Sequence, residues 1–355
     1  MTCQIIFLPV GNADSIVIQS ESSTIIVDIG KPKILEDLLQ KNKTSKIDKI
    51  YITHAHEDHC PSLTNLVDFL SNLRNKISIE HLHFPYDLIR AARSKIKAHK
   101  NNPNYNSKDL KSKKYQRLDD ALIRIEQWSR NNEITHSPIV LNGEKYFDGI
   151  LKVEALHPSQ AYIESHFDIN TSKLNEISTV LRVGYGKFSA LLLADIEGAG
   201  LTELLNFWKL NSKKTDFTTN IVKMPHHGAY PKNGKDLEEL LALVDAELAI
   251  LSVGSTNTYG HVEPKLFKAL IELQKNGDRR LTKFICTEVT RTCVHSASDR
   301  LTMGKSGLAK SQKCAGEITI IADVGGKWDL KTETDHSNEI KNFQYAACDG
   351  RSDFI

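Results

Sequence analysis

The sequence predicts a layered α/β fold whose polar site gathers along one sheet edge. Short apolar runs typical of strands each end on a potential metal ligand, at Asp28, His54, Asp195 and His226. After His54, apolar side chains recur at helical spacing from Leu63 to Leu73, so a helix follows that strand. Because strand ends of layered α/β folds lie at a common edge, we expect these four side chains to lie together.

The hexapeptide His54-Ala55-His56-Glu57-Asp58-His59 carries most of the chemical information. Imidazole and carboxylate groups bind zinc and similar divalent cations. In an extended segment His54 and His56 point the same way, and Asp58 and His59 follow where the chain turns into the helix. The spacing therefore predicts that one pair faces one metal ion and the second pair another. His-rich loops without metal exist, but this pattern directly after a strand favours the metal site.

Asp195 and the pair His226-His227 extend the candidate site. Asp195 follows an apolar run, where an aspartate can also serve as a helix N-cap. Burying two imidazoles without partners costs about 1–3 kcal/mol each, and metal ligation removes that cost for one of them. We expect one histidine of the pair to bind metal and the other to face the substrate. We take His226 as the predicted ligand and His227 as the predicted catalytic residue, and the sequence leaves open which of the two binds the metal.

These motifs resemble the metallo-β-lactamase hydrolase family. The resemblance implies a four-layer αβ/βα sandwich with two metal ions at one edge, bridged by Asp195, although Ala194 replaces the usual glycine. The runs 221–228, 249–254 and 257–261 resemble more specifically the hydrolase domain of ComEC competence proteins and their soluble relatives, over roughly residues 1–265. The implied metal ligands are His54, His56, Asp58, His59, Asp195 and His226.

One ligand that many members of the superfamily have is missing from this chain. Members often carry a further histidine before the bridging aspartate, but Asn175 to Arg182 contains none, as in the ComEC-type branch. His157 lies about one strand too early, so we expect it to have a structural role. One metal ion would then have fewer protein ligands, which leaves room for a phosphate oxygen.

A basic segment follows the first metal motif. Ten basic residues and one acid lie between Arg90 and Arg117, and a loop-like stretch at 101–107 interrupts them. We predict a helical hairpin inserted at about residues 88–130. A clamp for a polyanion and an ordinary solvated hairpin both fit this composition, and the position beside the metal motif favours the clamp. The predicted substrate-binding residues of the clamp are Lys108, Lys111, Lys113 and Lys114.

Composition and length limit the remaining possibilities. The chain has 355 residues, 40% hydrophobic and 25% charged, with a net charge of +2, as in ordinary globular proteins. No apolar stretch approaches 18 residues and the first ten residues resemble a strand, so we expect a cytoplasmic protein without membrane contact. Residues 266–355 are expected to form an extension packed on the sandwich, with a hairpin between Glu317 and Leu330.

The six cysteines favour reduced thiols. They contain no Cys-x-x-Cys pair, which argues against a zinc ribbon. Cys60 directly follows His59, and we expect it to pack under the helix and not to contact the metals. Cys286 to Cys348 all lie in the C-terminal extension, where the sequence leaves open whether they cluster.

The predicted chemistry is hydrolysis by a water activated between two divalent ions, Zn²⁺ or Mn²⁺. Asp58 would orient or deprotonate this water, and His227 or His261 would protonate the leaving oxygen. Equally, His261 can hydrogen-bond a backbone carbonyl. The resemblance and the basic hairpin favour a phosphodiesterase or nuclease acting on nucleic acid, with Asn257 among the substrate-binding residues. Two alternatives stay open: a hydrolase of a small ester, thioester or lactone, and a metal-binding module without turnover.

Overall fold

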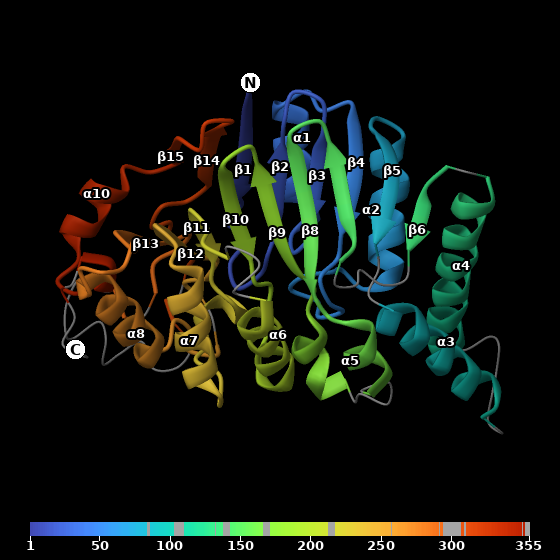
Figure 1. The fold of residues 1–355 in the computed structure, drawn as a ribbon. Coiled ribbons are helices and arrows are strands. Elements are labelled where there is room, and N and C mark those ends of the chain that lie inside the picture. The colour runs from blue at the N-terminus through green and yellow to red at the C-terminus, as the bar shows by residue number, and fades with distance from the viewer. Residues whose placement is uncertain are drawn as a thin grey trace.

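The computed structural model describes residues 1–83, 86–102, 110–131, 133–137, 143–165, 171–211, 217–256, 258–290, 292–293, 307–308, 310–349 and 351. Two sheets face each other at the centre of this part of the chain, and helices cover their outer faces (Figure 1). Both sheets mix parallel and antiparallel strand pairs, which confirms the predicted α/β sandwich. Among the described residues no helix is long and apolar enough to cross a membrane.

The first sheet has the strand order β15-β14-β1-β2-β3-β4-β5-β6. In chain order its strands are β1 (Thr2–Phe7), β2 (Ile16–Gln19), β3 (Thr24–Val27), β4 (Lys46–Tyr51), β5 (Ser78–His83), β6 (Thr135–Ser137), β14 (Ile318–Asp323) and β15 (Trp328–Thr332). The C-terminal strands β14 and β15 form the predicted hairpin, which extends this sheet beyond β1.

The second sheet has the order β13-β12-β11-β10-β9-β8-β7. Its strands are β7 (Lys145–Asp148), β8 (Leu151–His157), β9 (Val180–Tyr185), β10 (Phe188–Leu192), β11 (Ile221–Lys223), β12 (Leu248–Leu251) and β13 (Lys283–Cys286). The strands β10 to β13 run parallel, so the loops after them leave from one edge of the sheet.

Helices and short helical turns connect the strands. The helices are α1 (Pro32–Lys41), α2 (Leu63–Arg74), α3 (Tyr86–Lys100), α4 (Leu110–Arg130), α5 (Gln160–Ser165), α6 (Gly198–Asn211), α7 (Gly234–Val244), α8 (Pro264–Lys275) and α10 (His336–Glu339). The 3₁₀ turns are η1 (Thr171–Ile177), η2 (His226–Gly228), η3 (Ile340–Asn342) and η4 (Ala347–Asp349).

Alternation along the strands separates the hydrophobic core into layers. In β1, Ile5 and Phe7 pack between the two sheets, whereas Ile6 faces the helices α1 and α2. In β10, Leu192 packs between the sheets and Leu191 faces α6 and α7. Because both faces of each sheet are covered, the central strands are almost continuously apolar.

The predicted basic insertion is a helical hairpin. Helices α3 and α4 lie between β5 and β6 in the chain and stand at one end of the molecule beside α2 (Figure 1). Apolar residues of α4, among them Leu122, Ile125 and Trp128, join the core that covers the first sheet. The hairpin is therefore packed against the helix that follows the His54–His59 loop.

Candidate metal centre

The first group of candidate ligands lies in the loop after β4. His54 Nε2 and His56 Nδ1 approach each other to 3.1 Å, and Asp58 completes a group whose ligand atoms lie within 4.8 Å of one another. Thr53 anchors this loop, because its backbone N–H and its hydroxyl donate to the two carboxylate oxygens of Asp28, at 2.7 and 2.8 Å. A cation between the two ring nitrogens would satisfy both lone pairs at once.

The second group joins the two sheets. It consists of Asp58, His59, Asp195 and His227. His59 Nε2 lies 3.0 Å from Asp195 Oδ1, and His227 Nε2 lies 3.3 Å from Asp58 Oδ2 and 3.4 Å from Asp195 Oδ2. Asp58 belongs to both groups, so the two candidate sites are adjacent.

Hydrogen bonds orient the two buried histidines of this second group. His59 Nδ1 donates to Asp28 Oδ2 at 2.7 Å, and His227 Nδ1 donates to the carbonyl oxygen of Ser252 at 2.9 Å. Each ring therefore turns Nε2 toward the carboxylates, and the two Nε2 atoms are 3.3 Å apart. Metal-binding histidines in proteins show this arrangement, so the residues fit a divalent cation.

The charges of the second group also favour a cation. Burial alone would lower the pKa of His227, but the carboxylates of Asp195 and Asp58 raise it to about 9. Burial opposes the protonation of His59 as well, yet Asp195 and Asp28 raise its pKa well above the usual value. A buried site that draws protons onto two imidazoles can instead hold a metal ion in their place.

The turn η2 separates His226 from His227. Both residues have positive φ angles, 45° and 51°, so the chain turns sharply and sends the two rings in different directions. The structure differs here from the predicted ligand set, because it places His227 in a ligand group, whereas His226 Nδ1 lies 3.0 Å from Glu197 Oε2. Glu197 in turn accepts from Asn175 Nδ2 at 3.0 Å.

Backbone strain concentrates around these ligands. Six non-glycine residues of the described chain have positive φ, and four of them lie at this site: Asp28, Ala194, His226 and His227. Such conformations cost about 1–3 kcal/mol each and persist where the surrounding structure enforces them. The positive φ of Ala194 also explains why glycine is the usual residue before the aspartate.

The segment that lacks the third histidine lies beside the site. Asn175 and Ser178 are buried, and Thr179 N donates to Thr53 O at 3.0 Å, which ties this segment to the His54 loop. His157 is buried away from both ligand groups, with Nδ1 2.8 Å from Ser178 O and Nε2 3.2 Å from Glu203. These contacts agree with the structural role expected for His157.

The sequence did not predict the buried ion pair between Lys223 and Asp14, which lies next to the candidate metal centre. Lys223 and Asp14 are both fully buried and paired with each other, 209 positions apart in the chain. Lys223 Nζ also donates to Ala194 O at 3.0 Å and lies 3.9 Å from Asp195 Oδ1. A lysine inside the apolar run 221–224 was the one available signal, since a buried lysine requires a charged partner.

A cavity of about 420 Å³ opens above the ligands. Its lining residues are Asn12, His56, Glu57, Asp58, His226, His227, Tyr259 and His261. Tyr259 is 77% exposed, and its ring is nearly parallel to that of His261, with 5.8 Å between the centroids. Burial and the neighbouring His226 and His227 lower the pKa of His261 to about 4, which disfavours it as a proton donor.

The structure describes only some of the remaining predicted site residues. Lys108 and Asn257 lie outside the described residues. Lys111 is in α4, and Lys113 and Lys114 are exposed on the same helix. Cys60 packs in the helix-side core, as expected.

The part of the chain that contains the His54 loop matches a known protein family. The family model described as "Metallo-beta-lactamase superfamily" matches residues 8–141, a span that contains the His54 loop. Residues 8–141 are therefore similar to members of that superfamily. This match and the His/Asp groups agree with a metal-dependent hydrolase. Members use divalent metals, and the two ligand groups described above provide the corresponding side chains.

Three solved structures illustrate how distant the similarity is. The metallo-beta-lactamase fold protein YhfI from Bacillus subtilis is 10% identical, with 80% of this chain and 96% of that chain covered and a TM-score of 0.43. A metallo hydrolase from the archaeon Ignicoccus hospitalis is 12% identical (79% and 94% covered, TM-score 0.41). The short form of human tRNase Z is 13% identical (71% and 92% covered, TM-score 0.36). No curated protein matches the chain.

Proposed function

We propose that the protein is a metal-dependent phosphodiesterase that cleaves nucleic acid. The observation that carries this proposal is the pair of ligand groups that share Asp58 beneath one open cavity, with an exposed aromatic ring at the cavity. Adjacent divalent ions suit the in-line displacement at phosphorus, because they stabilise both the attacking and the leaving oxygen. The exposed ring offers a stacking surface for a base, which small esters and lactones do not need.

His54, His56 and Asp58 would hold one ion, and Asp58, His59, Asp195 and His227 would hold the other. When bound, these ions supply Lewis acidity and lower the pKa of a coordinated water. Thr53, Asp28 and the Ser252 carbonyl keep the ligands in place before substrate arrives. Such preorganisation lowers the energy needed to reach the transition state.

His226 is the residue placed to hold a proton for the leaving oxygen. Burial opposes its protonation, but the hydrogen bond to Glu197 and the charge of Asp195 raise the pKa of His226. Its ring lines the cavity, and Nε2 lies 4.0 Å from Asp195 Oδ2, beside the ligand group. Asn175 fixes Glu197, so the segment without the third histidine positions the proton donor.

We further propose that the chain belongs to the ComEC-like branch of the superfamily. The asparagine-to-serine segment and the Pro225-His226-His227-Gly228 turn, the features that carry the resemblance, both lie at the site and contact its residues. In this proposal Asn175 holds Glu197, and Glu197 holds the proposed proton donor His226.

A substrate panel tests the proposed function. Purified protein with Mn²⁺ or Zn²⁺ is expected to cleave single-stranded DNA, RNA and bis-p-nitrophenyl phosphate, and a His56→Ala/Asp58→Ala variant is expected to cleave none of them. Hydrolysis of lactones or thioesters without any phosphodiester cleavage would select the alternative function.

The same panel tests the basic hairpin as a nucleic-acid clamp. Arg93, Lys100, Arg117 and Arg124 are engaged by acidic residues. Lys113 and Lys114 are exposed, and we propose that they contact phosphates beyond the cleaved one. Reversing both charges should raise KM for long oligonucleotides and leave bis-p-nitrophenyl phosphate unaffected. Equal kinetics on both substrates would remove the clamp from the proposal.

Tyr259 is expected to recognise the base next to the cleaved phosphate. Replacing it by alanine should lower kcat/KM for thymidine 5′-p-nitrophenyl phosphate about 10-fold or more, since stacking on an aromatic ring contributes about 1–3 kcal/mol per base. A Tyr259→Phe variant keeps the ring and should behave like the wild type.

Methyl p-nitrophenyl phosphate serves as the matched substrate, because it has the same leaving group and no nucleoside. If Tyr259→Ala slows both substrates equally, the ring acts on the catalytic geometry and not on the base. Kinetic measurement of the two substrates side by side separates these outcomes.

A further inference from the structure

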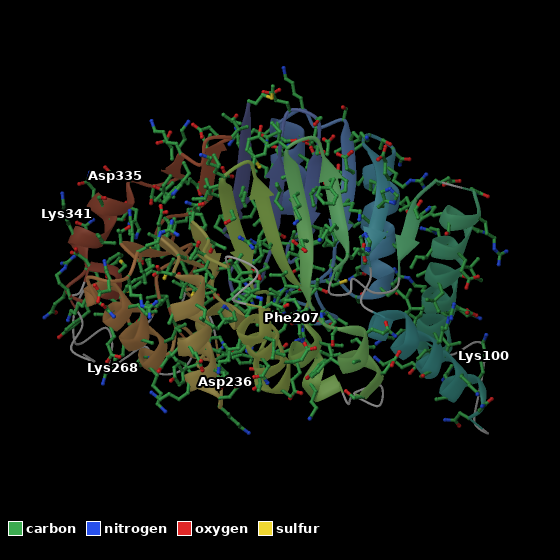
Figure 2. All side chains as sticks on the ribbon, viewed as in Figure 1. Lys100, Phe207, Asp236, Lys268, Asp335 and Lys341 are labelled. Carbon is green, nitrogen blue, oxygen red and sulfur yellow. The ribbon has the colours of Figure 1, made fainter. Side chains whose placement is uncertain are left out.

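Four of the six cysteines come together at the end of the molecule opposite the basic hairpin. Cys286 ends β13, Cys293 follows in the next loop, Cys314 precedes β14, and Cys348 lies in η4. Three of them are fully buried and belong to one hydrophobic core cluster, against which Cys348 packs. Figure 2 shows this end of the molecule around the labelled residues Asp335 and Lys341, with Lys100 of the hairpin at the other end.

Backbone contacts hold the cysteine-bearing segments next to one another. Ala315 N donates to Cys286 O at 3.0 Å, and Cys314 N donates to Thr287 O at 3.1 Å, so Cys286 and Cys314 lie side by side. The turn η4 packs on β13 and α8, which brings Cys348 to the same place. In a buried core, cysteine packs like other small apolar residues. Packing alone therefore does not explain why four of the six cysteines lie together.

A buried histidine borders the sulfurs. His336 is 3% exposed, and its Nε2 atom lies 3.9 Å from Cys348 Sγ. An imidazole N–H at this position can donate a hydrogen bond to the sulfur. Lys283 lies near Cys314 and His336, where it offsets the negative charge that a cluster of thiolates would carry.

We propose that Cys286, Cys293, Cys314 and Cys348 bind one structural zinc ion, with His336 hydrogen-bonded to the Cys348 sulfur. Four cysteine thiolates form one of the standard closed zinc sites of proteins. The sequence argued against a zinc ribbon because it lacks Cys-x-x-Cys pairs, but here four separate segments each supply one sulfur. The proposal concerns the C-terminal segments and is independent of the proposed catalytic function.

The chemistry of the thiols supports zinc in this place. Burial and the neighbouring thiols raise the pKa of Cys286, and the same two causes raise the pKa of Cys348. Thiols that resist ionisation together release their protons when one dication binds all of them. Among the described residues no three of these sulfurs lie within 4.8 Å of one another, so zinc binding would require the cysteine side chains to rotate toward a common point.

Metal analysis of an active-site variant tests the proposal. The His54→Ala/Asp58→Ala/His227→Ala variant removes ligands from both catalytic groups and leaves the cysteines intact. After dialysis against a mild chelator it should retain about one zinc per chain, because structural thiolate sites bind zinc tightly. Adding Cys314→Ser to this variant should lower the zinc content to near zero, whereas adding Cys3→Ser, outside the cluster, should not change it.

Two further measurements keep the proposal testable if the Cys314→Ser protein does not fold. X-ray absorption at the zinc edge of the active-site variant should show about four sulfur neighbours near 2.3 Å. Intact mass under non-reducing conditions should correspond to six free thiols. A chain without zinc, a nitrogen and oxygen shell, or a mass lower by two hydrogens, which would mean a disulfide, overturns the proposal.

Discussion

Replacing His227 by alanine is expected to lower the metal content of the His/Asp centre and to reduce the proposed phosphodiester hydrolysis by about 10³-fold or more. The reason is that His227 Nε2 belongs to the ligand group with Asp58, His59 and Asp195, and metal stabilisation of the transition state contributes several kcal/mol. Elemental analysis should show one metal ion fewer than in the wild type. Kinetics with added Mn²⁺ should restore only part of the rate.

The neighbouring His226→Ala variant is the matched control. His226 is held by Glu197 and is outside the ligand groups of the described residues, so this variant should keep the full metal content. Loss of a proton donor typically costs about 10²–10⁴-fold, and the loss should be far smaller for a p-nitrophenyl leaving group, which needs no proton. Metal loss in His226→Ala with full occupancy in His227→Ala would reverse the assignment of the two histidines.

Replacing Lys223 by methionine is expected to lower the free energy of unfolding by about 3–5 kcal/mol. The substitution leaves Asp14 buried without its cationic partner, and removal of one member of a buried ion pair has this cost. It also removes the hydrogen bond to Ala194 O, next to Asp195. Urea unfolding of the metal-free protein measures the change without a contribution from bound metal.

Two control variants show whether the loss of stability in Lys223→Met comes from the unpaired Asp14. A Lys223→Met/Asp14→Asn double variant carries no unpaired charge and should recover part of the lost stability. Lys33→Met removes the exposed partner of Asp37 and should change stability by no more than about 0.5 kcal/mol. A Lys223→Met protein as stable as Lys33→Met would show that the buried pair does not support the site.

Most of the strands and the position of the site could be predicted because their signals are local. The apolar runs ending at Asp28, His54 and Asp195 mark β3, β4 and β10, and the residues from Leu63 to Leu73 mark α2. Parallel strands place such residues at one edge of a sheet whatever the details of packing. The local pattern therefore places these residues at one candidate site.

The choice between His226 and His227 could not be made from the sequence. It depends on two consecutive positive φ angles and on the Ser252 carbonyl, which comes from the end of β12. The pairing of Asp14 with Lys223 likewise joins the loop between β1 and β2 of one sheet to strand β11 of the other, far apart in the chain. Residues that meet only through tertiary packing leave no periodic signal in one sequence.

For the basic hairpin, composition alone suggested more unpaired positive charge than the structure shows. The ten basic residues between Arg90 and Arg117 were compatible with a clamp or a solvated hairpin, and the structure pairs Arg117 with Asp68 of α2 and Arg93 and Lys100 with acids of α4. Acids at a distance in sequence therefore reduce the charge that the hairpin can offer to a substrate. Lys113 and Lys114 are exposed and are the residues that we propose to contact phosphates.

The metal dependence of phosphodiester cleavage decides whether the protein is the proposed metal-dependent phosphodiesterase. Protein stripped of metal should not cleave thymidine 5′-p-nitrophenyl phosphate, and activity should return with the addition of about two equivalents of Mn²⁺ or Zn²⁺ to the His/Asp centre. The His227→Ala variant, treated in the same way, should not regain the wild-type rate. Undiminished cleavage by the stripped protein, or no cleavage with any divalent ion, would contradict the proposed function.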